Sequence, residues 1–146
     1  MADGKPTILV VEDDPNDLEL TLLALDAGKC ANRLETARDG AEALDYLFRQ
    51  GAYAGRQDDD PRVILLDIKL PLVNGIDVLR AIKADRRTQH VPVVMLTSSS
   101  EDRDLTTCYQ LGANSYIVKP VDVDSFFDAV QHLGLYWLVL NQPDAQ

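Results

Sequence analysis

The chain has 146 residues, the length of one ordinary domain, and its 14 Lys and Arg against 24 Asp and Glu give a net charge of −10. A chain this acidic is poorly suited to binding the phosphates of DNA or RNA, and no apolar run approaches the roughly 20 residues of a membrane span. The N-terminus lacks the apolar core of a signal peptide, and the two cysteines fit no metal-binding spacing. We therefore expect one cytoplasmic domain that binds neither nucleic acid nor a membrane.

Short apolar segments alternate with helical patterns along the chain. Segments typical of strands occupy residues 7–11, 32–37, 63–66, 92–96 and 115–118. Helical patterns follow them, beginning after Asp14, after Asp39, after the turn 71–75, near Glu101 and near Asp122. Continuously apolar strands are typical of burial on both faces, and regular β-then-α order favours a parallel sheet with helices on both sides. The sequence therefore predicts an α/β fold with a doubly wound, five-stranded parallel sheet.

Residues 50–61 interrupt this alternation. The segment contains Gly51, Gly55 and the three aspartates 58–60, which are residue types of loops. We expect a solvated loop whose aspartates are surface charge.

Polar residues stand where four of the strands end. Glu12 and Asp13 follow the first strand, Asp67 ends the third, Thr97 the fourth and Lys119 the fifth. Ligands of doubly wound sheets bind at the carboxyl ends of the strands. Three crowded carboxylates repel one another, and Mg²⁺ with its preference for oxygen ligands offsets that repulsion. The Lys119 ammonium and the Thr97 hydroxyl stand at neighbouring strand ends. Together with the carboxylates, they predict a pocket for a phosphoryl group. The alternative is that these five polar residues merely terminate their strands and share no function. Their complementary chemistry favours a common binding site.

Four motifs in this order resemble the receiver domain of response regulators in two-component signalling. They are ILVVEDD (8–14), ILLDIKLPLVNG (64–75), VVMLTSSS (93–100) and YIVKP (116–120). The resemblance extends along nearly the whole chain and implies the flavodoxin-like (βα)5 receiver fold. It also implies that a sensor histidine kinase is the partner that donates a phosphoryl group.

The resemblance assigns chemical roles to the strand-end residues. Asp67 resembles the aspartate that is phosphorylated, and Lys119 the family's lysine, which neutralises the phosphoryl oxygens. Glu12 and Asp13 resemble the acidic pair that holds Mg²⁺ together with Asp67 and the backbone carbonyl of Lys69. Side chains two places after Asp67 and Thr97, here Lys69 and Ser99, tune dephosphorylation in the family.

The resemblance also assigns a conformational switch. Thr97 resembles the hydroxyl that bonds the phosphoryl group, and Tyr116 the aromatic residue whose rotamer follows it. A strand aromatic that merely packs on a helix remains the alternative for Tyr116. The family places a cis peptide before the position of Pro120.

An apolar segment follows the last helical pattern. We divide the chain into a receiver domain, residues 1–134, and a C-terminal extension, residues 135–146, which contains the only tryptophan, Trp137. The extension has two possible sites of burial: its own domain, or a second copy in a homodimer formed with the last helix. Together with the 50–61 insertion, it is similar to the single-domain response regulators of bacterial and cyanobacterial phytochromes, which implies a phytochrome kinase and a homodimer.

Other functions fit the residues less well. A Mg²⁺-dependent phosphohydrolase with Asp67 as nucleophile usually has a second carboxylate two places on, where this chain has Lys69. A flavodoxin-like electron carrier needs a phosphate-binding loop after the first strand, and residues 12–14 are all acidic. A receiver used only for docking would lack part of the acid–Asp–Thr–Lys set, which is complete. We therefore expect a stand-alone phosphoacceptor, not an enzyme, that signals to an unknown downstream protein by contact or phosphorelay.

Overall fold

The computed structural model describes residues 7–27, 33–98 and 103–135. One parallel sheet contains the five strands in the order β2-β1-β3-β4-β5. The strands are β1 Thr7–Val11, β2 Arg33–Ala37, β3 Val63–Asp67, β4 Val93–Thr97 and β5 Ser115–Val118. The helices are α1 Pro15–Ala27, α2 Gly40–Phe48, α3 Gly75–Ala84, α4 Asp104–Leu111 and α5 Val123–His132, with a short 3-10 helix, η1, at Gly51–Tyr53. The predicted doubly wound parallel sheet is confirmed.

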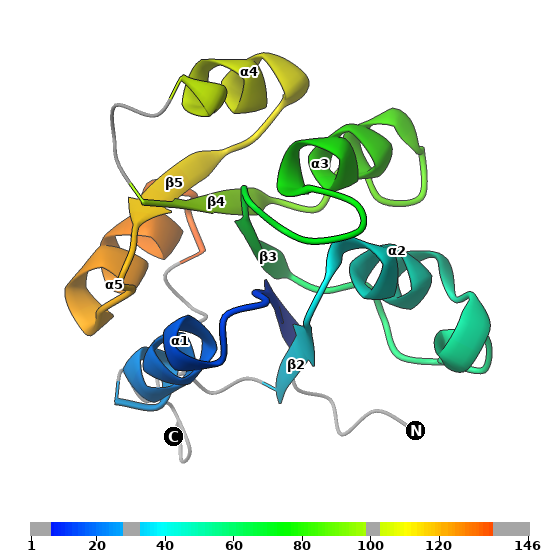
Figure 1. Ribbon diagram of the computed structural model, residues 1–146, viewed down its shortest axis with the longest axis horizontal. Coiled ribbons are helices and arrows are strands. Elements are labelled where there is room, and N and C mark those ends of the chain that lie inside the picture. The colour runs from blue at the N-terminus through cyan, green and yellow to red at the C-terminus, as the bar shows by residue number, and fades with distance from the viewer. Residues whose placement is uncertain (1–6, 28–32, 99–102, 136–146) are drawn as a thin grey trace.

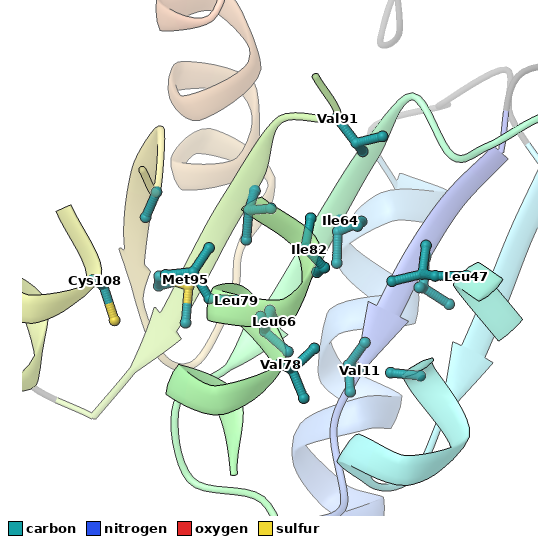
Figure 2. Packing of buried hydrophobic residues seen from close by; sticks show 14 of the residues in the cluster. Val11, Leu47, Ile64, Leu66, Val78, Leu79, Ile82, Val91, Met95 and Cys108 are labelled. Carbon is teal, nitrogen blue, oxygen red and sulfur yellow. The ribbon is translucent and has the colours of Figure 1, made fainter. Parts of the chain in front are cut away.

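Helices cover both faces of the sheet (Figure 1). Helices α1 and α5 pack on one face, and α2, α3 and α4 on the other. Alternate residues of the central strand β3 belong to the two cores: Ile64 and Leu66 face α2 and α3, whereas Val63 and Leu65 face α1 and α5. Figure 2 shows Val78, Leu79 and Ile82 of α3 packed against the first of these faces. Burial on both faces explains why β1, β3 and β4 are continuously apolar.

Local capping fixes where helices begin. The Asp14 carboxylate accepts the N–H groups of Asn16 and Asp17 at 2.8 and 3.0 Å, and Pro15 occupies the first helical position of α1. Asp122 and Ser125 form a capping box at the start of α5. Helix α1 therefore starts directly beside the end of β1, as the sequence predicts.

The 50–61 insertion is more ordered than the sequence predicts. It contains η1, and two of its three aspartates are partly buried in ion pairs, Asp58 with Arg33 of β2 and Asp60 with Arg56. The expectation of solvated surface charge is therefore wrong for these two and holds for the exposed Asp59. Local composition identifies a loop, but the arginine that meets Asp58 comes from a strand 25 residues away.

Some sequence predictions fall outside the described residues. These are the predicted start of a strand at Asn32, the predicted start of a helix near Glu101, the tuning position Ser99, and residues 136–146 of the extension. The division into residues 1–134 and 135–146 therefore stays a prediction. Within the described part of the chain, no helix has the length and apolar character to cross a membrane.

Candidate functional site

The sheet order brings the predicted site residues to one edge of the fold. Strand β3 lies between β1 and β4, with Val11 opposite Leu66 and Asp67 opposite Leu96. Strand β5 continues this edge, with Thr97 opposite Val118. All strands are parallel, so the residues that end β1, β3, β4 and β5 meet at the carboxyl edge.

Three carboxylates form a cluster at this edge. Glu12, Asp13 and Asp67 each offer an oxygen, and these oxygens all lie within 4.8 Å of one another. Glu12 and Asp67 are buried, at 0% and 4% exposure, whereas Asp13 is exposed. Hard divalent cations prefer such oxygen sets, so these residues fit a metal ion that enters from the side of Asp13.

The turn after β3 holds the Asp67 side chain. The Lys69 backbone N–H donates to Asp67 Oδ1 at 3.1 Å, while the Lys69 side chain is exposed. Gly75 is needed close by, because a Cβ on this residue would stand 2.0 Å from the Asp67 carbonyl oxygen. The metal-ligand role of the Lys69 carbonyl stays a prediction.

Lys119 binds three carboxylates at once. Its Nζ donates to Asp67 Oδ2 at 2.9 Å, to Asp17 Oδ2 at 3.0 Å and to Glu12 Oε1 at 3.2 Å. The pairs with Asp67 and Glu12 follow from the strand-end pattern. Sequence reasoning missed Asp17, although an acid in the first turn of a helix that starts at the site is a usable signal.

The crowded charges change the proton affinity of the site. Burial, a hydrogen bond shared with Asp67 and the negative charge of Asp67 together raise the pKa of Glu12 to about 8. Burial alone would lower the pKa of Lys119, but its hydrogen bonds to Asp67 and Asp17 and the charge of Glu12 outweigh that effect and raise it. These surroundings therefore favour the protonated form of Glu12 at neutral pH and keep Lys119 charged.

Thr97 and Tyr116 lie in different surroundings. Thr97 is buried at the end of β4, and its carbonyl accepts the Lys119 N–H at 2.7 Å. Tyr116 is 37% exposed on the edge strand β5, with its ring edge-to-face to Tyr109 of α4 at 6.3 Å between centroids. The peptide before Pro120 is cis, as the resemblance implies. Tyr116 thus lies on the outer α4–β5 surface, apart from the acidic cluster.

A groove opens next to the acids. It has a volume of about 430 Å³, and Asp13, Lys69, Asn74 and Asp104 contribute to its lining. The groove therefore borders the exposed acid of the cluster, Asp13, and the turn that follows β3.

The family model of the response regulator receiver domain matches residues 8–131. The chain belongs to the response regulator receiver family. Receiver domains bind a divalent metal ion in an acidic pocket of the kind that this chain contains. The receiver assignment also excludes the flavodoxin-like electron carrier.

Several relatives resemble this receiver over most of their length. The structure of the bacteriophytochrome response regulator AtBRR is 52% identical, with 94% of this chain and 98% of that chain covered and a TM-score of 0.86. Response regulator Rcp1 from Synechocystis sp. is 35% identical over 90% of this chain and 88% of its own length. The probable methanogenesis regulatory protein FilR2 from Methanothrix harundinacea is 38% identical, with 92% and 85% covered. A Mn²⁺-bound structure of Rcp1 has a TM-score of 0.75, with 34% identity over 91% of this chain and 94% of that one.

Proposed function

We propose that Asp67 accepts a phosphoryl group from a sensor histidine kinase, with Mg²⁺ held by Glu12, Asp13, Asp67 and the Lys69 carbonyl. The observation that carries this proposal is the position of Asp67, which shares the cluster of acids and lies 2.9 Å from the Lys119 ammonium. A carboxylate nucleophile, a cation site and a fixed positive charge are the parts that phosphoryl transfer requires.

The proposed reaction is one in-line displacement. An Asp67 carboxylate oxygen attacks phosphorus, a new O–P bond forms, and the P–N bond of the phosphohistidine breaks, with its electron pair returning to the imidazole. Lys119 neutralises charge on the phosphoryl oxygens, and the bound Mg²⁺ supplies further neutralisation. The resulting acyl phosphate is later hydrolysed by water, with the chain acting only on its own phosphoryl group.

Phosphorylation is proposed to switch the surface around α4 and β5. The Thr97 hydroxyl lies at the adjacent strand end, where it can donate to a phosphoryl oxygen. In this proposal the Thr97 movement leaves room for Tyr116, whose ring lies partly exposed beside α4. A downstream protein reads the change by contact or receives the phosphoryl group in a relay.

The proposed kinase is a phytochrome, and the proposed location of this protein is the cytoplasm. The proposed assembly is a homodimer through α5 and the C-terminal extension. A phytochrome kinase is supported by the 52% identity of this chain to AtBRR, whose name is bacteriophytochrome response regulator. The apolar side chains Val123 and Phe127 of α5 are 37% and 39% exposed and support a contact surface. Substituting Phe127→Asp is expected to shift the protein to monomer on a sizing column with light scattering, whereas Leu23→Asp on α1 leaves it dimeric. A monomeric parent protein would refute the dimer.

Intact mass spectrometry tests the phosphoacceptor directly. The protein is incubated with Mg²⁺ and a small phosphodonor such as acetyl phosphate, quenched in the cold and weighed. We expect a gain of one phosphoryl group that disappears in EDTA and in Asp67→Asn, and that persists in Asp59→Asn, which removes an exposed acid. No gain under conditions that modify a known receiver, or an equal gain in Asp67→Asn, would refute the assignment.

A further inference from the structure

The Lys119 ammonium has as many carboxylate partners as it has N–H donors. An ammonium carries three N–H groups, and here they face Glu12, Asp17 and Asp67 at 2.9–3.2 Å. The first and third of these acids belong to the strand ends, but Asp17 lies on helix α1. Asp17 is outside the set of residues that the receiver resemblance assigns a role.

The three carboxylate partners of Lys119 have different roles in the proposed reaction. Glu12 and Asp67 provide oxygens to the metal cluster, and Asp67 also becomes covalently bound to phosphorus. Asp17 is outside that cluster, so neither the metal ion nor the phosphoryl group needs its carboxylate. Asp17 can therefore remain the partner of Lys119 throughout the phosphorylation cycle.

We propose that Asp17 is a positioning residue, which holds the Lys119 ammonium in place beside Asp67 and limits its competition with the metal ion for the Glu12 and Asp67 carboxylates. This inference rests on the proposed function of the site. Asp17 acts through Lys119 and does not touch the reacting atoms.

Both ends of the Asp17–Lys119 pair are fixed. The backbone N–H of Asp17 donates to the Asp14 carboxylate at 3.0 Å, and the next residue, Leu18, is buried in the core. On the other side, the Lys119 N–H donates to the Thr97 carbonyl at 2.7 Å. The Asp17 side chain is 32% exposed, so water stabilises its charge without a metal ion. A fixed, partly exposed carboxylate at this place restrains the ammonium at little cost in desolvation.

Removing Asp17 changes the competition for the metal ligands. The ammonium then has only Glu12 and Asp67 as carboxylate partners among those described, and both are needed by the cation. The pocket also loses one negative charge. Both effects weaken Mg²⁺ binding, but only the first depends on Lys119.

Calorimetric titration of the unphosphorylated protein with Mg²⁺ tests the inference. We expect Asp17→Asn to weaken binding about three- to tenfold, the range of a partly exposed charged contact. Asp26→Asn removes the same charge from an exposed position on the same helix and is expected to change binding less than about twofold, as is typical of a screened surface charge. In a Lys119→Met background, Asp17→Asn is likewise expected to change binding less than about twofold, because its partner is missing. Asp17→Glu keeps the carboxylate and is expected to recover most of the affinity.

A second measurement follows the lysine itself. Lysine-selective ¹H–¹⁵N spectra of the metal-free protein are expected to show a Lys119 ammonium signal with slow hydrogen exchange. We expect that signal to broaden or move in Asp17→Asn and to stay in Asp26→Asn, with urea unfolding as the check that both variants are folded.

The outcomes separate this inference from the proposed function. Unchanged Mg²⁺ binding in Asp17→Asn, or an equal loss in the Lys119→Met background, would overturn the role of Asp17 while the parent protein still binds Mg²⁺ and is phosphorylated. A parent protein that neither binds Mg²⁺ nor gains a phosphoryl group would overturn both.

Discussion

Replacing Glu12 with Gln is expected to stabilise the metal-free protein and to weaken its binding of Mg²⁺. Glu12 is fully buried and shares its pocket with the charge of Asp67. Glutamine keeps the size of the side chain and a donor for Asp67, but it cannot ionise. The difference in stability between the variant and the parent protein therefore measures how much the buried, ionisable Glu12 beside Asp67 destabilises the fold.

The pKa of Glu12 sets the magnitude. It stands at about 8 in the folded, metal-free protein against 4.5 for an ordinary glutamate. Between these values the folded state binds a proton that the unfolded chain has released, so the free energy of unfolding falls as the pH rises. pH 7 lies about 2.5 units above the pKa of the ordinary glutamate in the unfolded chain, and at about 1.4 kcal/mol per unit this gives a ceiling of about 3–4 kcal/mol. Because the Lys119 ammonium can move toward an ionised Glu12, we expect Glu12→Gln to gain about 1–3 kcal/mol at pH 7.

Urea unfolding followed by circular dichroism measures this difference. The parent protein and Glu12→Gln are compared in EDTA at pH 5.5, 7 and 8.5, with Glu19→Gln as an exposed control on α1. The advantage of Glu12→Gln is expected to grow with pH, and excess Mg²⁺ is expected to reduce or reverse it, because the ion binds and stabilises the folded parent protein more strongly. A constant difference across this range, or a variant that is less stable at pH 8.5, would refute the reasoning.

Three further substitutions test other parts of the structure by thermal unfolding. Gly75→Ala is expected to lower the free energy of unfolding by about 2 kcal/mol or more and to impair phosphorylation, since the new Cβ would stand 2.0 Å from the Asp67 carbonyl oxygen. The control Gly55→Ala places a Cβ with nothing within 4 Å and should leave the stability unchanged. Arg56→Ala is expected to lower the free energy of unfolding by about 1–3 kcal/mol, because the buried Arg56 guanidinium donates to the Tyr46 carbonyl and lies 4.1 Å from the centre of the Tyr46 ring. The control Arg86→Ala removes an exposed arginine and should change stability little. Leu72→Gly is expected to raise the free energy of unfolding by about 0.5–1 kcal/mol, because Leu72 is 80% exposed and has a left-handed backbone, with φ at 67°, which glycine adopts without strain. An unchanged or lower melting temperature would contradict this prediction.

Helix starts and buried strands are predicted by local patterns. The caps Asp14 and Asp122 act on N–H groups two or three residues away, so their effect is visible in the sequence. The runs of β1, β3 and β4 are apolar because both faces of each strand are buried. In contrast, Asp58 looks like an ordinary loop charge until the fold supplies Arg33 of β2 as its partner.

The sequence by itself determined the class of the sheet and the chemistry at its carboxyl edge. Acids, a hydroxyl and a lysine stand at the ends of four of the five strands, and parallel strands necessarily bring such residues to one side. Only the tertiary structure decided which of them touch. Lys119 and Asp17 are 102 residues apart, and their 3.0 Å contact depends on the packing of α1 beside α5 on one face of the sheet. Tyr116 points to the outer surface because β5 is the edge strand, a position that sheet order assigns and local pattern does not. Distances between side chains depend on sheet order and register, which are set by packing over the whole domain.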